Sequence, residues 1–301
     1  MSTSADSAPA PSFAELQRDL PATSPRAWRF RALAAASRGG ALLSEGLRIG
    51  HACGFDSGPF MAHVYANQPR GVTALGRLLD RRLLTRRTCQ AFREIRGLAR
   101  DALDEAVHAC PREAPLIADL AAGPAPYLFE VLASRPRASA IVGDIDPAAL
   151  TQAQAHAARL GLADRVTFVR ASAFDRVALG RLDPAPDVVV ELGLYGIYHD
   201  DALIERHFVD LAQTISPRQI VFNVQTHNPE IEHIARVWRD HRGERCVWRL
   251  RPVESILRWA AAAGYEPASI RADSFGIYRV VRLLASGSRS PSSALSGEAT
   301  G

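Results

Sequence analysis

Two short apolar runs in this chain each end near a carboxylate, and each is followed by residues with helical spacing. The first run covers residues 116–120 and contains Asp119; the second covers residues 140–144 and ends in Asp144. Short apolar runs that alternate with helical segments are typical of buried parallel strands joined by crossover helices. Ligands of such open sheets bind beyond the carboxyl ends of the strands. The two acids therefore predict an α/β fold with a ligand site at one edge of its sheet.

The alternation of strands and helices continues to residue 284. Helices are predicted at residues 124–134, 147–160, 200–215, 229–241 and 252–263. Strands are predicted at residues 116–120, 140–144, 166–170, 187–191, 219–224, 267–272 and 276–284. No helix separates the last two strands, so they are expected to form an antiparallel pair at the edge of an otherwise parallel sheet. The prediction is a Rossmann-like sheet of seven strands.

Residues 13–110 carry a helical pattern and are predicted to form an N-terminal helical cap before a sheet domain at 111–284. The longest predicted helix runs from Val72 to Ala109, with apolar residues at helical spacing and arginines on its other faces. This arginine-rich run could contact an anionic membrane surface, although a solvated helix face is the plainer explanation. Residues 1–12 and 285–301 are rich in small and polar residues and are predicted to be disordered tails.

The amino-acid composition excludes several classes of reaction and binding site. None of the 36 basic residues is a lysine, which excludes Schiff-base chemistry and a phosphate-loop lysine. The four cysteines form no C-x-x-C pair, so neither a metal site nor a disulfide framework is predicted. No apolar run is long enough to span a bilayer. The N-terminal residues lack the basic-then-apolar order of a secretory signal, so a cytoplasmic location is expected.

Groups at the first four predicted strand ends fit an adenosyl ligand. The small turn after Asp119 lets the backbone approach a ligand closely, and Asp144 can accept both ribose hydroxyls. Ser172 and the N–H of Ala173 can bind the adenine, and Glu191 can lie beside a positive charge. The predicted cofactor-binding residues are Asp119, Ala121, Gly123, Asp144, Ile145, Ser172, Ala173 and Glu191.

Two cofactors that contain adenosine, NAD and S-adenosylmethionine, are the alternative ligands for this predicted site. NAD needs free N–H groups at a helix N-terminus for its pyrophosphate. Pro124 and Pro126 each remove an N–H from this turn, and no G-x-G-x-x-G is present there. S-adenosylmethionine carries no phosphate, and its ammonium group can pair with Asp119. The residues therefore favour S-adenosylmethionine, while a helix-capping role for Asp119 or Asp144 is the structural alternative.

Polar and aromatic residues after the fourth and fifth strands are predicted to surround a methyl acceptor. The candidate catalytic residues are Tyr195, His199 and His227, because a histidine or tyrosine at such a position can exchange a proton. A helix start before Asp200 is the structural alternative for His199. The other residues of the predicted acceptor pocket are Tyr65, Asn67, Tyr198 and Gln225.

Seven segments of the chain share the residue pattern of one protein family. They are residues 54–58, 64–68, 75–81, 119–123, 193–198, 229–242 and 275–278. In these segments, and over residues 44–284 as a whole, the chain resembles a bacterial family of class I S-adenosylmethionine-dependent methyltransferases. Members often follow an α/β-hydrolase domain similar to a lysophospholipase. The resemblance implies a cofactor held by the first three strand ends, although Ala121, Ala125 and Ser172 depart from the usual residues.

These observations predict in-line transfer of a methyl group from S-adenosylmethionine to a small-molecule or lipid-related acceptor, driven largely by positioning. The alternative is a methyltransferase-fold module with impaired catalysis that binds a lipid surface or a hydrolase partner. The altered turn at Ala125 and Pro126 motivates that alternative. Nucleic acid is not expected as a partner, because no platform of aromatic and basic residues is evident.

Overall fold

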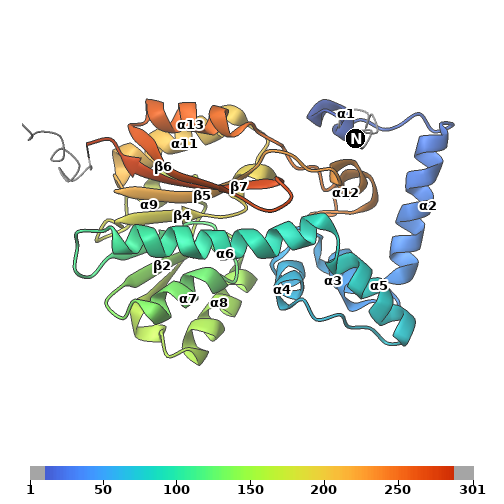
Figure 1. The fold of residues 1–301 in the computed structure, drawn as a ribbon, viewed down its shortest axis with the longest axis horizontal. Helices are drawn as coiled ribbons and strands as arrows, with labels where there is room; N and C mark the ends of the chain where they lie inside the picture. Colours follow the sequence, from blue (N-terminus) through green and yellow to red (C-terminus); the bar gives the residue numbers. More distant parts are fainter. Residues whose placement is uncertain (1–10, 288–301) are drawn as a thin grey trace, which may run out of the picture.

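A central seven-stranded sheet forms one half of the molecule in the computed structural model, which describes residues 11–287 (Figure 1). The strand order is β3-β2-β1-β4-β5-β7-β6. The first five strands pair in parallel, and β7 lies antiparallel between β5 and β6. The strands are β1 (Leu116–Asp119), β2 (Ser139–Asp144), β3 (Val166–Arg170), β4 (Val188–Glu191), β5 (Gln219–Gln225), β6 (Tyr265–Ala272) and β7 (Tyr278–Ala285). The predicted mostly parallel sheet with an antiparallel edge pair is confirmed.

Two hydrophobic cores cover the two faces of this sheet. Because side chains alternate along a strand, Ile117 enters one core, whereas its neighbours Leu116 and Ala118 enter the other. The first core takes in α6 (Arg87–His108), α7 (Pro126–Ser134) and α8 (Pro147–Arg159). The opposite core takes in α9 (Arg176–Leu179), α10 (Leu194–Ile197), α11 (Asp201–Thr214) and α13 (Val253–Ala262). A short 3-10 helix, Ala163–Arg165, precedes β3.

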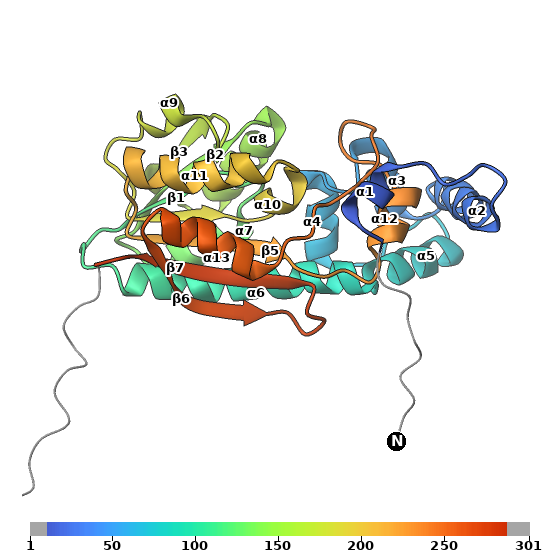
Figure 2. The ribbon, with the colours of Figure 1, turned by 90° about the horizontal axis from the view of Figure 1, so that it is seen from above.

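A third core holds the N-terminal helices together at the carboxyl-edge side of the sheet (Figure 2). These helices are α1 (Phe13–Gln17), α2 (Pro25–Gly40), α3 (Glu45–Cys53), α4 (Gly58–Ala66) and α5 (Ala74–Leu84). The third core also contains residues from α12 (Ile231–Val237) and from the segment after it, including Trp238 and Trp248. The cap is therefore completed by a segment that lies between β5 and β6 in the sequence.

The single long helix predicted from Val72 to Ala109 is wrong, because the structure has two helices there. Helix α5 ends at Leu84, and α6 begins at Arg87. Glu230 explains the break: its Oε2 accepts hydrogen bonds from the Thr88 N–H at 2.9 Å and from the Thr88 hydroxyl at 2.7 Å. A carboxylate at a helix N-terminus is favourable. A partner 142 residues away in the sequence thus starts α6.

The predicted helix at 229–241 is also too long, since α12 ends at Val237. The backbone at Trp238 is extended, and the carbonyl of Arg239 accepts a hydrogen bond from the Phe55 N–H at 2.9 Å. Ser12 caps α1, and Ala285 ends β7, so these two residues of the predicted tails belong to the folded part. The rest of both tails lies outside the described residues, apart from Pro11 and the turn at 286–287. Within residues 11–287, no helix combines the length and hydrophobicity needed to cross a membrane.

Candidate functional site

Asp119 closes β1 as a fully buried carboxylate. The Tyr127 hydroxyl donates a hydrogen bond to its Oδ2. Its Oδ1 has no hydrogen-bond partner of ordinary geometry among residues 11–287. Burial raises the pKa of Asp119 to about 7, although Tyr127 and the Ala121 N–H offset part of the rise. A buried acceptor without a donor is costly, so this oxygen suits a cationic or N–H donor from a ligand.

The turn between β1 and α7 is tied to the end of β2. Gly123 and Ala125 both adopt left-handed backbone conformations, with φ of 53° and 45°. The Gly123 N–H donates to Asp144 Oδ2 at 2.8 Å, and the Asp146 N–H donates to Asp144 Oδ1 at 2.9 Å. A carboxylate offers about four acceptor positions. Asp144 therefore retains two of them, one for each hydroxyl of a ribose.

Three further residues of the predicted cofactor site follow β2 and β3. Ile145 is 54% exposed directly after Asp144, which is unusual for a large aliphatic side chain at a strand end. Ser172 and Ala173 line a small cavity of about 20 Å³ behind the β3 end. The Ser172 hydroxyl accepts a hydrogen bond from the Phe174 N–H at 3.2 Å and keeps its own proton free to donate. A space of this size holds about one water molecule, so the adenine contacts stay a prediction.

Glu191 ends β4 and is enclosed by protein. Its two carboxylate oxygens accept hydrogen bonds from the Tyr195 hydroxyl and from Nε2 of His207, each at 2.5 Å. Glu191 and Tyr195 are fully buried, and His207 is 1% exposed. Tyr195 therefore lies in the core of the sheet domain rather than on a pocket wall. Neither Glu191 nor Tyr195 offers a free polar atom to a ligand, and the sequence did not indicate His207.

The two histidines proposed from the sequence lie in different surroundings. Nε2 of His199 donates to the Val247 carbonyl at 2.8 Å, and its ring packs edge-on against Phe13 at 4.7 Å. His227 is exposed in the loop after β5. Gln225, which precedes it, is buried and donates to the Tyr278 hydroxyl at 3.0 Å. The structure therefore uses His199 and Gln225 to join neighbouring segments.

Tyr65 of α4 and Tyr198 belong to the predicted acceptor pocket. The guanidinium of Arg96 lies 5.6 Å from the centre of the Tyr65 ring and pairs with Glu130 of α7. Burial raises the pKa of Tyr65 to about 12, although the charge of Arg96 offsets part of the rise. The Tyr198 ring packs edge-on against Phe174 at 4.6 Å, and burial raises the pKa of Tyr198. Asn67 is exposed at the left-handed C-terminus of α4.

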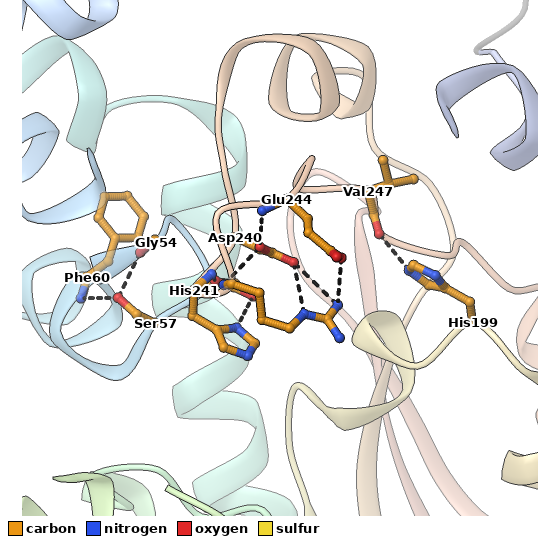
Figure 3. Close-up of polar contacts among 10 residues, drawn as sticks. Gly54, Ser57, Phe60, His199, Asp240, His241, Glu244 and Val247 are labelled. Atoms are coloured by element: carbon orange, nitrogen blue, oxygen red, sulfur yellow. Dashed lines mark hydrogen bonds and ion pairs between the residues drawn. The ribbon is translucent and has the colours of Figure 1, made fainter. Parts of the chain in front are cut away.

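An aspartate–histidine pair that the sequence does not indicate joins the loop between α3 and α4 to the segment after α12. Asp56 accepts two hydrogen bonds from His241: one from the backbone N–H to Oδ1 at 2.7 Å and one from ring Nδ1 to Oδ2 at 2.8 Å. The side chain of Asp56 is 6% exposed, whereas that of His241 is 47% exposed. Figure 3 shows His241 and, farther along the same segment, the His199 contact with Val247. Asp56 belongs to the 54–58 segment noted above, but nothing in the sequence indicates its partner 185 residues away.

Gly54 permits the close approach that builds this pair. Its φ is 97°, and a Cβ at this position would lie 2.3 Å from the backbone nitrogen of His241. Gly54→Ala is therefore expected to lower the free energy of unfolding by about 2 kcal/mol or more, because of backbone strain and overpacking. Urea unfolding checks this, with Gly58→Ala as the control, since a Cβ there meets nothing within 4 Å. Equal stability of the two variants would contradict the tight contact.

Comparison with known proteins finds similarity over most of the chain. Residues 3–284 match the family described as "Putative methyltransferase". The uncharacterized protein YnbC of Escherichia coli (strain K12) is 31% identical over 242 residues, which cover 79% of this chain and 41% of YnbC. The chain therefore spans less than half the length of that curated relative.

Solved structures share the fold at low sequence identity. A possible exported protein from Bordetella parapertussis gives a TM-score of 0.64 at 18% identity, covering 88% of this chain and 99% of that chain. Magnesium protoporphyrin IX methyltransferase (ChlM) from Synechocystis PCC 6803, solved with bound SAH, gives 0.54 at 15% identity, covering 77% and 96%. The strand order and these similarities identify the fold as that of class I methyltransferases. With the match over residues 3–284, the chain belongs to this methyltransferase family.

Proposed function

We propose that this protein is an S-adenosylmethionine-dependent methyltransferase that acts on a small-molecule or lipid-related acceptor. The observation that carries the proposal is the position of Asp119 and Asp144 at the ends of adjacent parallel strands, with the turn after Asp119 held to Asp144 through the Gly123 N–H. When bound, S-adenosylmethionine supplies a methyl group already activated by its positive sulfur. The neighbour ChlM acts on a magnesium porphyrin, so this fold accepts small-molecule acceptors.

The chain's own groups have distinct roles in this proposal. Asp119 Oδ1 binds the ammonium group of the donor, and Asp144 binds the ribose hydroxyls. Ile145, Ser172 and Ala173 bind the adenine. Both oxygens of Glu191 already accept hydrogen bonds, from Tyr195 and His207, so Glu191 does not contact the donor directly. Its role is to attract the positive charge of the donor from beneath the site. Tyr65, Tyr198 and the cap then enclose the acceptor, whose reaction gains most from being held in line with the methyl group.

The Asp56–His241 pair is the candidate proton acceptor. Asp56 fixes the ring through Nδ1, so Nε2 is the nitrogen left for another partner. An orienting carboxylate behind a histidine is the arrangement that general bases use. During transfer, the acceptor's O–H or N–H proton would move to Nε2 as its heteroatom attacks the methyl carbon and the thioether departs. We propose this pair alongside His199 and His227, whose surroundings support the role less well.

Asp144→Ala is expected to weaken binding of S-adenosylhomocysteine by at least about tenfold, because charge-assisted hydrogen bonds to the ribose are lost. Isothermal titration calorimetry measures this, and Asp164→Ala, at an exposed acid within the 3-10 helix, is the control. Incubation of the wild type with radiolabelled donor and a fractionated cell extract then shows which acceptor class takes the label. An unchanged affinity of Asp144→Ala would remove this residue from the donor site.

One observation favours the second candidate function, a module with impaired catalysis. Ala125 is an alanine in the left-handed region at the donor turn, where a non-glycine residue is strained, and Pro126 follows it without an N–H. Such a turn would bind the donor weakly or not at all. Donor titration separates the two candidates, because only the enzyme needs a donor affinity in the range of cellular donor concentrations.

A further inference from the structure

A groove of about 450 Å³ lies in the cap, away from the predicted donor site. Its walls come from two loops, residues 41–45 before and into α3, and residues 69–72 before α5. Figures 1 and 2 both place α2 and α5 at the end of the molecule farthest from the sheet. Pockets of this size take small-molecule ligands or parts of larger ones. We call it the cap groove.

Buried hydrogen bonds hold both walls of the cap groove in place. Asp80, fully buried in α5, accepts from the Ser44 hydroxyl at 2.7 Å and the Gly46 N–H at 2.6 Å on one wall. It accepts from the Arg70 N–H at 2.8 Å on the other wall. The Val72 N–H also donates across the groove to the Leu43 carbonyl at 3.0 Å. The cap groove is therefore preformed rather than a gap between mobile loops.

Large aliphatic side chains are exposed around the cap groove. Leu42 and Val72 line it and are 80% and 81% exposed. Leu75 and Leu78, on the adjoining α5, are 55% and 46% exposed. Helical spacing puts Leu75 and Leu78 on the side of α5 opposite its buried residues. An exposed apolar cluster of this kind marks an interaction surface.

The same surface carries a strong excess of positive charge. Arg48, Arg70 and Arg77 line the cap groove, and Arg81 and Arg82 follow on α5; all five are exposed. Glu45 is the one acidic residue of the groove lining, and its carboxylate lies 3.9 Å from the Arg70 guanidinium. Exposed arginines therefore alternate with exposed aliphatic residues over one end of the cap.

We infer that the cap groove and the exposed face of α5 bind the surface of an anionic phospholipid membrane. The arginines would bind lipid phosphates, and the groove is large enough for a head group. The aliphatic side chains would enter the interface, where their exposure is no longer unfavourable. Arginine stems also cover apolar surface while their charges stay in the polar layer. Aliphatic rather than aromatic residues lie between the arginines, which favours lipid over single-stranded nucleic acid.

Vesicle flotation tests this inference on the full chain and needs no knowledge of the methyl acceptor. The wild type is expected to float with vesicles of phosphatidylcholine that contain about a third phosphatidylglycerol, and not with pure phosphatidylcholine. Arg70→Gln with Arg77→Gln should weaken binding about twenty-fivefold, at roughly fivefold for each charge. Leu42→Ser with Val72→Ser should weaken it by a similar factor.

Matched controls are available elsewhere on the surface. Val177→Ser, at a side chain 64% exposed on α9, and Arg137→Gln, with a side chain 71% exposed, should bind vesicles like the wild type. Equal binding to both vesicle types, no binding by the wild type, or groove variants that float unchanged would each overturn the inference. So would RNA binding that is lost in the groove variants while vesicle binding is absent. The inference goes beyond the proposed methyl transfer, whose own failure would appear separately in the donor titration.

Discussion

Asp80→Asn is expected to lower the free energy of unfolding by about 4 kcal/mol, in the range found when one partner of a buried charged cluster is removed. Asp80 accepts four hydrogen bonds: from the Ser44 hydroxyl, the Gly46 and Arg70 N–H groups, and Nε2 of His63 at 2.9 Å. An asparagine of the same size turns an NH₂ group toward donors. Whichever way its amide is turned, the N–H of either Gly46 or Arg70 then faces another N–H donor, and that backbone hydrogen is left without an acceptor.

The pH dependence of stability gives this prediction a second readout. Burial alone would raise the pKa of Asp80, but the bonds from His63, Arg70, Ser44 and Gly46 outweigh it and lower the pKa. A carboxylate whose pKa is lower in the folded protein stabilises the fold at pH values above its unfolded pKa, which is about 3.9 for aspartate. This contribution is lost as the pH falls from that value through the pKa of the folded protein. The stability difference between wild type and Asp80→Asn should therefore shrink below about pH 4.

Urea unfolding at pH 7 and at several acid pH values measures both effects. Asp101→Asn is the control, because Asp101 is half-exposed. Within residues 11–287, its side chain accepts hydrogen bonds only from the exposed Arg100. It should change stability by no more than about 0.5 kcal/mol. If Asp80→Asn behaves like Asp101→Asn at pH 7, the buried cluster does not hold the walls of the cap groove.

His241→Gln is expected to reduce methyl transfer at least about a hundredfold while leaving the affinity for S-adenosylhomocysteine unchanged, since general bases contribute factors of this size. The measurement is the rate of label transfer from radiolabelled donor into the extract fraction that the wild type labels. A lowered transfer rate together with an unchanged donor affinity is a result that a merely structural histidine would not explain.

Two further variants sharpen this test. Asp56→Asn should lower the rate less than His241→Gln, because it disturbs the orientation of the ring but leaves the nitrogen that takes the proton. His108→Gln, at an exposed histidine that ends α6, is the control and should keep full activity. A His241→Gln variant that transfers methyl groups at the wild-type rate would exclude the Asp56–His241 pair as the base.

The sheet could be predicted from the sequence because its signals are local. The apolar runs and the residues that start and stop helices lie close together in the chain: Asp146 caps α8 beside Pro147, and Gly161 follows its end with a φ of 69°. The five parallel strands were placed to within a residue or two at each end. The acids at 119 and 144 were also evident, because each directly follows a strong apolar run.

The parts that could not be predicted depend on partners far away in the sequence. Glu230 breaks the long helix that its leucine spacing indicated, and the Asp56–His241 pair joins two loops through Gly54. Tyr195 has the residue type expected at an acceptor pocket, but its hydroxyl turns inward to Glu191. Local patterns carry no information on such pairings. The cytoplasmic location and the hydrolase partner stay predictions.

Calorimetric titration of the wild type with S-adenosylhomocysteine tests the central proposal most directly. Binding to one site per chain at micromolar concentration is the predicted result, weakened in Asp144→Ala. No heat of binding up to millimolar ligand, from protein whose cooperative unfolding shows it to be folded, would contradict the proposed donor site and favour the non-catalytic module.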